Sequence, residues 1–398
     1  MSDGEIAGYH YSTREPLQLR WRAGVLTGVD APAAPPPVGR WLAPALFDLQ
    51  VNGYGGVDFQ QDGLSSGDLL RAVDCLHRDG CSSILLTLIT DRWDALMQRL
   101  RRLRELRAQT PELLRAIAGW HVEGPFLSAE PGYCGAHDPG LMLDPTSQHI
   151  HELRDAAGTD PLLLTLAPER PGAIEAIARA VSCGMKVSLG HTNAPQAALA
   201  AAVQAGATGF THLGNGCAKE QDRHDNIFWR VFETPGLVVG LIPDRIHVSP
   251  AFLRISHRQL GAENVYYTTD AASPAGAPPG RYRLGRLEVE VAADQIVRQP
   301  GRTNFAGSAL RPLEGVFRAA EMLGCPWQQA WERFSARPRA LLGLPAPLAP
   351  GQAASFCVVE DVPGRGNTVT VYSHGARRSE LPARARLHGA GMKERGKA

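Results

Sequence analysis

The chain has 398 residues, of which 44% are hydrophobic and 20% charged, and its formal net charge is +1. This length suffices for one large α/β domain with a small additional one. The balanced charge gives no indication of nucleic acid or a membrane surface as a partner. No apolar leader and no apolar run of about 18 residues is found, which argues against secretion and membrane insertion. Seven cysteines without a CxxC pair indicate reduced thiols and a cytoplasmic protein.

The first 42 residues are expected to form part of a small β domain. Short alternating segments between residues 8 and 30 predict an antiparallel sheet. A linker rich in proline and alanine follows at residues 31–37. It separates this part from the following segment, which has a different sequence pattern.

Residues 43–345 alternate short apolar runs with helix-like stretches. This alternation predicts a parallel β/α architecture, and eight strands are the number in a closed (β/α)₈ barrel. A doubly wound open sheet is the alternative, but no GxGxxG motif follows the first strand. The candidate strands are residues 45–51, 83–88, 117–122, 162–166, 186–189, 209–211, 238–242 and 265–268; helices are expected at 68–78, 93–107, 173–182, 194–205 and 250–260.

The part after the last barrel strand predicts a return to the small domain. Residues 282–297 have hairpin character, and residues 312–323 and 327–342 have helical periodicity. Strands at 355–359 and 368–372 could rejoin the N-terminal sheet, so residues 346–375 are assigned to the small domain. The basic tail, residues 376–398, is expected to be disordered. The fold class expected is α/β, a TIM-like (β/α)₈ barrel with a small β-sandwich domain built from both termini.

Ionisable side chains follow most of the predicted strands. In a (β/α)₈ barrel the carboxyl ends of the strands meet on one face, where catalysis takes place. Glu123 follows the third strand, His191 and His212 follow the fifth and sixth, and Asp270 follows the eighth. Two imidazoles and one carboxylate are the donors of a catalytic zinc site with a position open for water, and Asp270 is then the natural general base. Each residue alone could be a hydrogen-bonded or ion-paired structural group; four together favour a metal site.

A long polar loop at residues 128–139 follows the third strand and contains His137. From its position alone, His137 is either a surface histidine or a side chain that covers the site. In the second case it would polarise a substrate carbonyl.

Eight motifs in this region suggest a family. The chain reads DLQVNGYGGVDF at 48–59, HVEGPFL at 121–127, GAHDP at 135–139, GHTNA at 190–194, THLGN at 211–215, GLIPD at 240–244 with His247 after it, TDA at 269–271 and AGSAL at 306–310. In this order, between about residues 45 and 345, they resemble the N-acetylglucosamine-6-phosphate deacetylases of the amidohydrolase superfamily.

The resemblance implies a reaction and roles for residues. The enzyme would release acetate from N-acetylglucosamine 6-phosphate, an amino sugar phosphate, and would act as a homodimer. Asp270 would be the catalytic acid/base and His137 would polarise the acetamide carbonyl. The ligands of the metal would be Glu123, His191 and His212, and the substrate contacts would be Ala136, His137, Asn215, Gly216, His247, Ala306, Gly307 and the phosphate-binding Arg223, which in family dimers can reach in from the neighbouring subunit.

The first strand bears on the number of metal ions. Many amidohydrolases carry His-x-His there and bind a second metal, whereas this chain has Gln50 and Asn52. An amide is a poor ligand beside imidazoles, so the chain resembles the single-metal branch, with one Zn²⁺ or Fe²⁺. Otherwise Gln50 and Asn52 simply form hydrogen bonds in the first-strand loop.

The chain departs from the family pattern around the expected phosphate and sugar pocket. Residues 215–217 are Asn-Gly-Cys where the family often has Asn-Ala-Met, residues 223–229 lack the expected Gly and Pro, and residues 244–247 are Asp-Arg-Ile-His where it has Asp-Gly-x-His. Arg223 could therefore be a helix-capping surface residue. Two other functions remain open: an N-acyl hydrolase of the same superfamily with a different or unphosphorylated substrate, and a metal-poor sugar-phosphate binding or regulatory protein.

Overall fold

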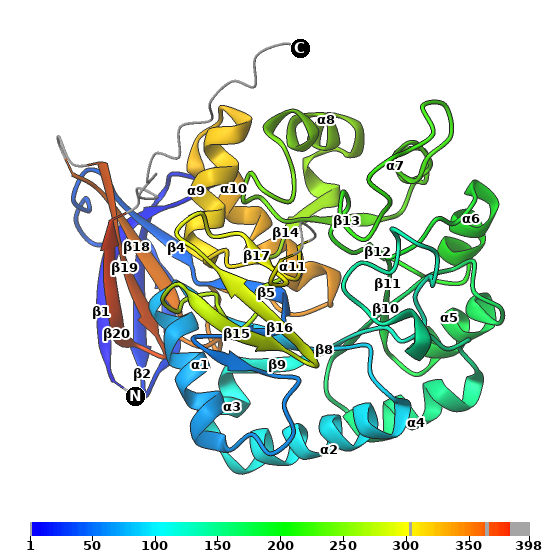
Figure 1. Cartoon of the computed structure of the whole chain (residues 1–398). Coiled ribbons are helices and arrows are strands. Elements are labelled where there is room, and N and C mark those ends of the chain that lie inside the picture. Colours follow the sequence, from blue (N-terminus) through cyan, green and yellow to red (C-terminus); the bar gives the residue numbers. More distant parts are fainter. Residues whose placement is uncertain (1, 302–304, 363–365, 383–398) are drawn as a thin grey trace.

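The computed structural model describes residues 2–301, 305–362 and 366–382. Two bodies lie side by side (Figure 1), a seven-stranded sheet and a barrel surrounded by helices. No helix in the described ranges combines the length and apolar character that crossing a bilayer would require.

The eight predicted barrel strands are confirmed and form one parallel sheet. Their order in the sheet, β14-β13-β12-β11-β10-β9-β8-β5, is their order in the chain. Each strand therefore pairs with its successor, and the first and last strands meet at a seam that closes the barrel. The strands are β5 Leu46–Val51, β8 Cys81–Ile89, β9 Ile117–Glu123, β10 Leu162–Leu166, β11 Lys186–Leu189, β12 Gly209–Phe210, β13 Val238–Leu241 and β14 Val265–Tyr267.

The connecting helices cover the outside of the barrel (Figure 1). Their starts follow capping chemistry: Ser65 and Asp68 form a capping box at the first, and Ser249 caps the eighth. The helices are α1 Ser66–Arg78, α2 Trp93–Gln109, α3 Pro111–Ala116, α4 Ser147–Ala157, α5 Ala173–Ser182, α6 Gln196–Gln204, α7 Ile227–Phe232, α8 Pro250–Leu260, α9 Pro312–Leu323, α10 Trp327–Arg333 and α11 Ala336–Leu341, with 3₁₀ turns η1 Pro139–Leu141 and η2 Ala262–Asn264.

A layer of hydroxyl groups lies inside the barrel below the strand ends. The ring Nε2 of His121 is 2.8 Å from the Thr165 hydroxyl, which is 2.8 Å from that of Thr211. Ser188 lies 2.7 Å from Thr211. Because buried polar groups are tolerated when they are paired, this layer forms a stable floor beneath the strand ends.

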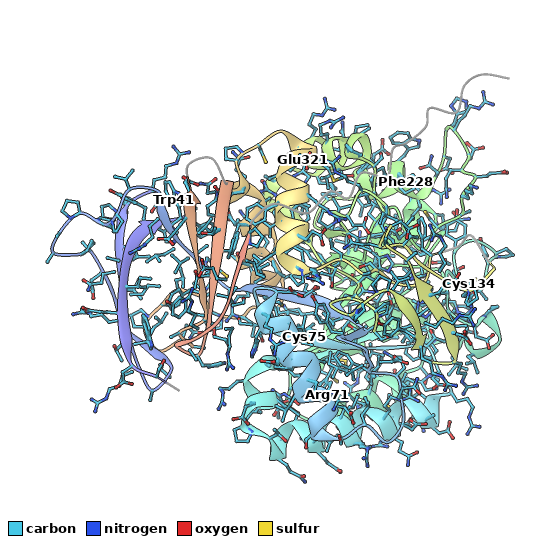
Figure 2. The ribbon with its side chains drawn as sticks, turned by 60° about the vertical axis from the view of Figure 1, so that its left-hand side comes forward. Trp41, Arg71, Cys75, Cys134, Phe228 and Glu321 are labelled. Atoms are coloured by element: carbon cyan, nitrogen blue, oxygen red, sulfur yellow. The ribbon has the colours of Figure 1, made fainter. Side chains whose placement is uncertain are left out.

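The sandwich-like small domain joins both ends of the chain. Its strand order is β20-β19-β18-β4-β1-β2-β3, and β18 pairs with β4 in antiparallel register. Leu19, Trp21, Leu42 and Phe356 are among the residues of its own apolar core. Figure 2 shows Trp41 on this domain and, on α1, Arg71 and Cys75. The strands are β1 Gly4–His10, β2 Pro16–Arg22, β3 Val25–Asp30, β4 Arg40–Pro44, β18 Phe356–Val362, β19 Gly366–Ser373 and β20 Ala376–Pro382.

Three expectations need correction. The disordered tail was predicted from residue 376, but residues 376–382 form the edge strand β20, and residues 383–398 lie outside the described ranges. The N-terminal part of the small domain runs to Pro44, two residues past the expected boundary at 42, because β4 belongs to its sheet. The helix expected over 327–342 is broken between α10 and α11, since Pro338 fits only in the first turn of a helix.

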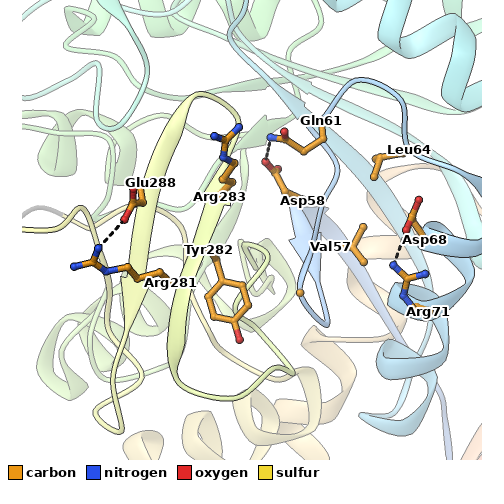
Figure 3. Close-up of a pocket in the computed structure, with 11 residues that line it drawn as sticks. Val57, Asp58, Gln61, Leu64, Asp68, Arg71, Arg281, Tyr282, Arg283 and Glu288 are labelled. Atoms are coloured by element: carbon orange, nitrogen blue, oxygen red, sulfur yellow. Dashed lines mark hydrogen bonds and ion pairs between the residues drawn. The ribbon is translucent and has the colours of Figure 1, made fainter.

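The predicted hairpin is confirmed by β15 Gly280–Leu284, β16 Leu287–Val291 and β17 Val297–Arg298. A hollow of about 480 Å³ separates it from the ribbon of β6 Gly53–Tyr54 and β7 Val57–Asp58. Figure 3 shows Tyr282 and Arg281 on one side of this hollow and Arg71 on the other. No residue of the predicted metal ligand set lines it.

Candidate metal centre and active site

Three side chains from three strand ends meet at the carboxyl face of the barrel. Glu123 is the last residue of β9, His191 comes two residues after β11, and His212 comes two residues after β12. Their ligand atoms lie within 4.8 Å of one another, and all three residues are buried. One carboxylate and two imidazoles suit a divalent ion with an open coordination position. The residues that the sequence singled out as ligands therefore fit a metal.

Glu123 lies at the centre of this group. Its Oε1 is 2.8 Å from Nε2 of His212 and 3.6 Å from Nε2 of His191. Its Oε2 accepts a hydrogen bond from the Gln50 amide at 3.0 Å. Burial disfavours the charged carboxylate, but the hydrogen bond from His212 and the neighbouring imidazoles outweigh it and hold the pKa of Glu123 well below its usual range. The carboxylate is therefore ionised, as a cation ligand must be.

His191 is held in one orientation by the two loops around it. Its Nδ1 is 2.8 Å from the carbonyl oxygen of Tyr133, so Nδ1 carries the proton and Nε2 keeps its lone pair on the Glu123 side. A Cβ added at Gly135 or at Gly216 would lie 2.7 Å from the ring. Both glycines also have positive φ, so glycine is required there for conformation and for space.

His191, His212 and Asp270 share an unusual backbone conformation. Their φ angles are 50°, 31° and 51°, in the left-handed region that non-glycine residues rarely adopt. Such strain costs on the order of 1–3 kcal/mol per residue and is concentrated at functional sites. Its recurrence at three strand ends indicates that these ends are shaped to place side chains.

Asp270, the predicted general base, is partly buried beside the metal ligands. Its Oδ1 accepts a hydrogen bond from the Asn52 amide at 2.7 Å. Desolvation, reinforced by the negative charge of Glu123, raises the pKa of Asp270 to about 7. A carboxyl group that titrates near neutrality can both accept a proton and return it. A bound cation would lower this pKa again, because it favours the carboxylate.

The two first-strand amides donate to carboxylates. Gln50 donates to Glu123, and Asn52 donates to Asp270. An NH₂ group that faces the site has no lone pair to offer a cation. This geometry supports the hypothesis that Gln50 and Asn52 do not bind a second metal, and it gives both side chains the hydrogen-bonding role that was the alternative.

His137 lies on the loop after β9 and covers the ligand group. Its Nδ1 is 2.8 Å from the Thr90 hydroxyl, and its Nε2 is 3.7 Å from Oε2 of Glu123. Only 9% of the residue is exposed, so it is not a surface loop histidine. Burial lowers the pKa of His137, which favours the neutral ring. A hollow of about 520 Å³ lies beside it and is also lined by Ala136 and Thr90.

Three further predicted substrate contacts lie close to the same strand ends. His247 is 2.6 Å from Asp244; burial opposes its charged form, but the charge of Asp244 outweighs burial and raises the pKa of His247. Ala306 is buried, and a Cβ added at Gly307 would lie 3.3 Å from the carbonyl oxygen of Asp270. The loop that contains Ala306 and Gly307 therefore packs against the predicted base.

The loop after β12 carries the other predicted contacts. The Asn215 amide donates to the carbonyl oxygen of His212 at 3.4 Å. Arg223 is exposed, and in the described ranges it has no hydrogen-bond or ion-pair partner. It does not cap α7, because Asn226 is the N-cap. The structure thus removes the capping alternative for Arg223 but does not join Arg223 to the ligand group.

Sequence reasoning did not assign roles to Tyr133, Thr90 or Asp48. Tyr133 orients His191 through its backbone, which any residue offers, so no sequence signal exists for it. Thr90 orients His137 from the end of a neighbouring strand. Asp48 was quoted as part of the first-strand motif only; it precedes Gln50 by two residues, and the alternation of side chains along a strand places both on one face.

Replacing Glu123 by Gln tests the ligand group. The variant keeps the shape of the side chain and removes its charge, so we expect metal affinity to fall by more than the roughly 10–100-fold that outer-sphere substitutions cause. Elemental analysis after dialysis measures this. Asp79→Asn is the matched control, since Asp79 is a buried carboxylate that accepts from Tyr54 outside this group. Full metal occupancy in Glu123→Gln would exclude Glu123 as a ligand.

A pair of glycine variants tests the packing of His191. Gly216→Ala should lower metal affinity, because the new methyl group would displace the ring. Gly343→Ala is the control: Gly343 also has positive φ, 72°, but nothing lies within 4 Å of an added Cβ. Both should lose about 1–2 kcal/mol of stability to backbone strain. Equal metal content in the two variants would show that Gly216 does not position His191.

The comparisons with known proteins agree with this geometry. No family model matches the chain. The chain is 33% identical to the N-acetylglucosamine-6-phosphate deacetylase of Mus musculus over 336 residues, 81% of this chain and 80% of that one. It is 30% identical to an N-acetylgalactosamine-6-phosphate deacetylase of Shewanella sp., over 80% of this chain and 79% of that one.

Solved structures give the same result. A mutant of the N-acetyl-D-glucosamine-6-phosphate deacetylase from Mycobacterium smegmatis, in complex with N-acetyl-D-glucosamine-6-phosphate, matches with a TM-score of 0.84 and 29% identity, over 95% of this chain and 100% of that one. Sequence similarity over four-fifths of the chain and a common architecture over nearly all of it lead to one conclusion: the chain belongs to the N-acetylglucosamine-6-phosphate deacetylase family of the amidohydrolase superfamily.

Proposed function

We propose that the protein hydrolyses the acetamide bond of N-acetylglucosamine 6-phosphate, giving acetate and glucosamine 6-phosphate. The observation that carries this proposal is the buried Glu123, His191 and His212 group with Asp270 beside it, in a chain of this family. A buried carboxyl group beside a ligand set that fits a metal is an arrangement for hydrolysis rather than for binding alone.

One divalent ion, Zn²⁺ or Fe²⁺, would be held by Glu123, His191 and His212, since imidazole and carboxylate suit both metals. When bound, such an ion supplies Lewis acidity to a water molecule and to the acetamide carbonyl. The donation of both first-strand amides toward carboxylates supports a single ion.

Asp270 and His137 would move and place the protons of the reaction. Asp270 accepts a proton from the attacking water and returns it to the departing amine, so the carboxylate is regenerated in each cycle. His137 is anchored on Thr90, and burial lowers its pKa and favours the neutral ring. It donates toward the acetamide oxygen as negative charge develops there. Atoms and charge therefore balance: water and the neutral amide become acetate and the ammonium form of the amine, which receives both protons of the water.

The sugar phosphate would be bound by the loops that surround these groups. Asp244 raises the pKa of His247 and so favours its charged form, which can donate to a hydroxyl or phosphate oxygen. Exposed Arg223 is free to bind the phosphate, from its own subunit or from the neighbour in a homodimer. The contacts proposed for the substrate are Ala136, His137, Asn215, Gly216, Arg223, His247, Ala306 and Gly307.

A second substrate deserves testing because one relative of similar identity is a deacetylase of the galactosamine epimer. An unphosphorylated amino sugar is a further alternative, since residues 215–217 and 244–247 depart from the family pattern. The seven cysteines are free thiols, which supports a reducing cytoplasmic location.

Asp270→Asn tests the general base. The amide has the shape of the carboxylate but cannot accept the proton, so we expect kcat to fall by roughly 10²–10⁴-fold while the metal stays bound. Acetate release from N-acetylglucosamine 6-phosphate measures turnover. Asp79→Asn, the buried carboxylate outside the site, should keep wild-type kcat. Undiminished turnover in Asp270→Asn would refute the mechanism.

Substrate choice is tested by comparing kcat/KM for N-acetylglucosamine 6-phosphate, its galactosamine epimer and N-acetylglucosamine. We expect the first to be preferred. Arg223→Ala should lower kcat/KM for the phosphorylated sugar by roughly 10–100-fold, the loss of one charged hydrogen bond, and should leave the unphosphorylated sugar unaffected. Arg22→Ala on the small domain serves as the control. Equal losses on both sugars would exclude Arg223 as a phosphate ligand.

A further inference from the structure

Asp48 is a fully buried carboxylate inside the barrel to which the mechanism gives no role. It lies on β5 and is 0% exposed. No cation pairs with it in the described ranges; instead it accepts hydrogen bonds from the hydroxyls of Thr268 and Thr269 at 2.5 and 2.6 Å. It also accepts from the backbone N–H groups of Thr269 at 3.0 Å and Gln50 at 3.1 Å. Such a concentration of donors requires an explanation, since burying a carboxylate is unfavourable.

The hydrogen bonds from Thr268 and Thr269 cross the seam of the barrel, whereas the one from Gln50 stays within β5. β5 and β14 are the two ends of the eight-stranded sheet, and no strand ladder joins them in the described ranges. A single parallel bridge links Val51 to Ala271. The Asp48 side chain supplies connections between the first and last strands that backbone pairing supplies elsewhere in the barrel.

On the β14 side of the seam, the residues bonded to Asp48 immediately precede Asp270. Thr269, which donates to Asp48 through both its hydroxyl and its backbone N–H, is the residue before Asp270. The Thr269 hydroxyl also accepts from the backbone N–H of Ala271 at 3.1 Å. The hydroxyl thus fixes the chain on both sides of Asp270. Asp270 itself has a φ of 51°, a conformation that persists only when neighbouring contacts hold it.

On the β5 side of the seam, Asp48 lies four residues before Asn52. Asp48 accepts from the backbone of Gln50, and the backbone N–H of Asn52 donates to the carbonyl oxygen of Ala271 at 2.7 Å. These contacts fix the register in which the Asn52 amide reaches Oδ1 of Asp270. A shift of the seam would therefore move the Asp270 carboxylate and its hydrogen-bond donor relative to each other.

We propose that Asp48 is a positioning residue for the hydrolysis: through the Thr269 hydroxyl and backbone it holds Asp270 in its left-handed conformation and in register with Asn52. This inference rests on the proposed role of Asp270 as general base. It goes beyond that role because it assigns a function to a side chain that touches neither metal ligands nor substrate. The competing explanation is that Asp48 and the threonines stabilise the barrel only.

Two variants of Thr269 separate the explanations. Thr269→Val keeps the size of the side chain and removes the hydroxyl, whereas Thr269→Ser keeps the hydroxyl and removes a methyl group. Because a misplacement of about 1 Å can cost on the order of 100-fold in rate, we expect kcat of Thr269→Val to fall by about 10–100-fold, with KM and metal content unchanged. Thr269→Ser should retain kcat. A purely packing role predicts the reverse order, and that result would overturn the proposal.

The same substitution in an Asp270→Asn background gives a second readout. If Thr269 acts through Asp270, Thr269→Val should cost nothing further once the carboxylate is gone. Additive losses would overturn the proposal. Asp48→Asn places an NH₂ group against the donors of Thr269 and should reproduce the kcat loss of Thr269→Val; Asp79→Asn is the matched control, in which thermal stability changes and kcat does not.

Failure of this proposal is distinguishable from failure of the proposed mechanism. Undiminished turnover in Asp270→Asn alone would reject the general base, whatever Thr269 does. A loss in Asp270→Asn together with wild-type kcat in Thr269→Val would reject only the positioning role of Asp48.

Discussion

The burial of one ionised carboxylate, Glu123, is the constraint on which the site depends. An unpaired charge at the end of a buried strand would be strongly destabilising. Here His212 lies 2.8 Å from one oxygen and Gln50 donates to the other. His212 and Gln50 therefore stabilise the negative charge of the carboxylate, one at each oxygen. The second imidazole, His191, faces the same carboxylate. A divalent ion would complete this arrangement, because it would neutralise the charge that the imidazoles only partly balance.

The barrel makes this compensation possible by bringing distant segments of the chain to one face. The ligand group and Asp270 come from four different strand ends, and three of these four residues, His191, His212 and Asp270, have positive φ. This backbone strain is maintained by contacts that take no part in the reaction. Two glycines pack against His191, and the Tyr133 carbonyl orients its ring. Asp48 accepts hydrogen bonds across the seam next to Asp270. The catalytic geometry is thus a property of the supporting residues as much as of the reacting ones.

The sequence predicted the strands and the grouping of Glu123, His191 and His212 because both depend on local pattern. Short apolar runs give the eight barrel strands, and an ionisable residue just beyond a run must lie at the common face. Contacts set by tertiary structure could not be predicted from the sequence. The direction of the Gln50 and Asn52 amides, for example, depends on Glu123 and Asp270, which lie far along the chain. Residues 376–382 are polar enough to suggest disorder, but as an edge strand they need only one pairing partner. Pro338 was the visible signal for the break between α10 and α11.

In a single-metal site, one divalent ion binds to Glu123, His191 and His212 and none binds to the first strand. Anomalous diffraction from crystals grown with excess Zn²⁺ tests it most directly, because it locates each ion independently of activity. We expect one strong peak at this face of the barrel, coordinated by the carboxylate of Glu123 and the two imidazoles. A second peak coordinated by Gln50 or Asn52, or a site without Glu123 among its ligands, would contradict it.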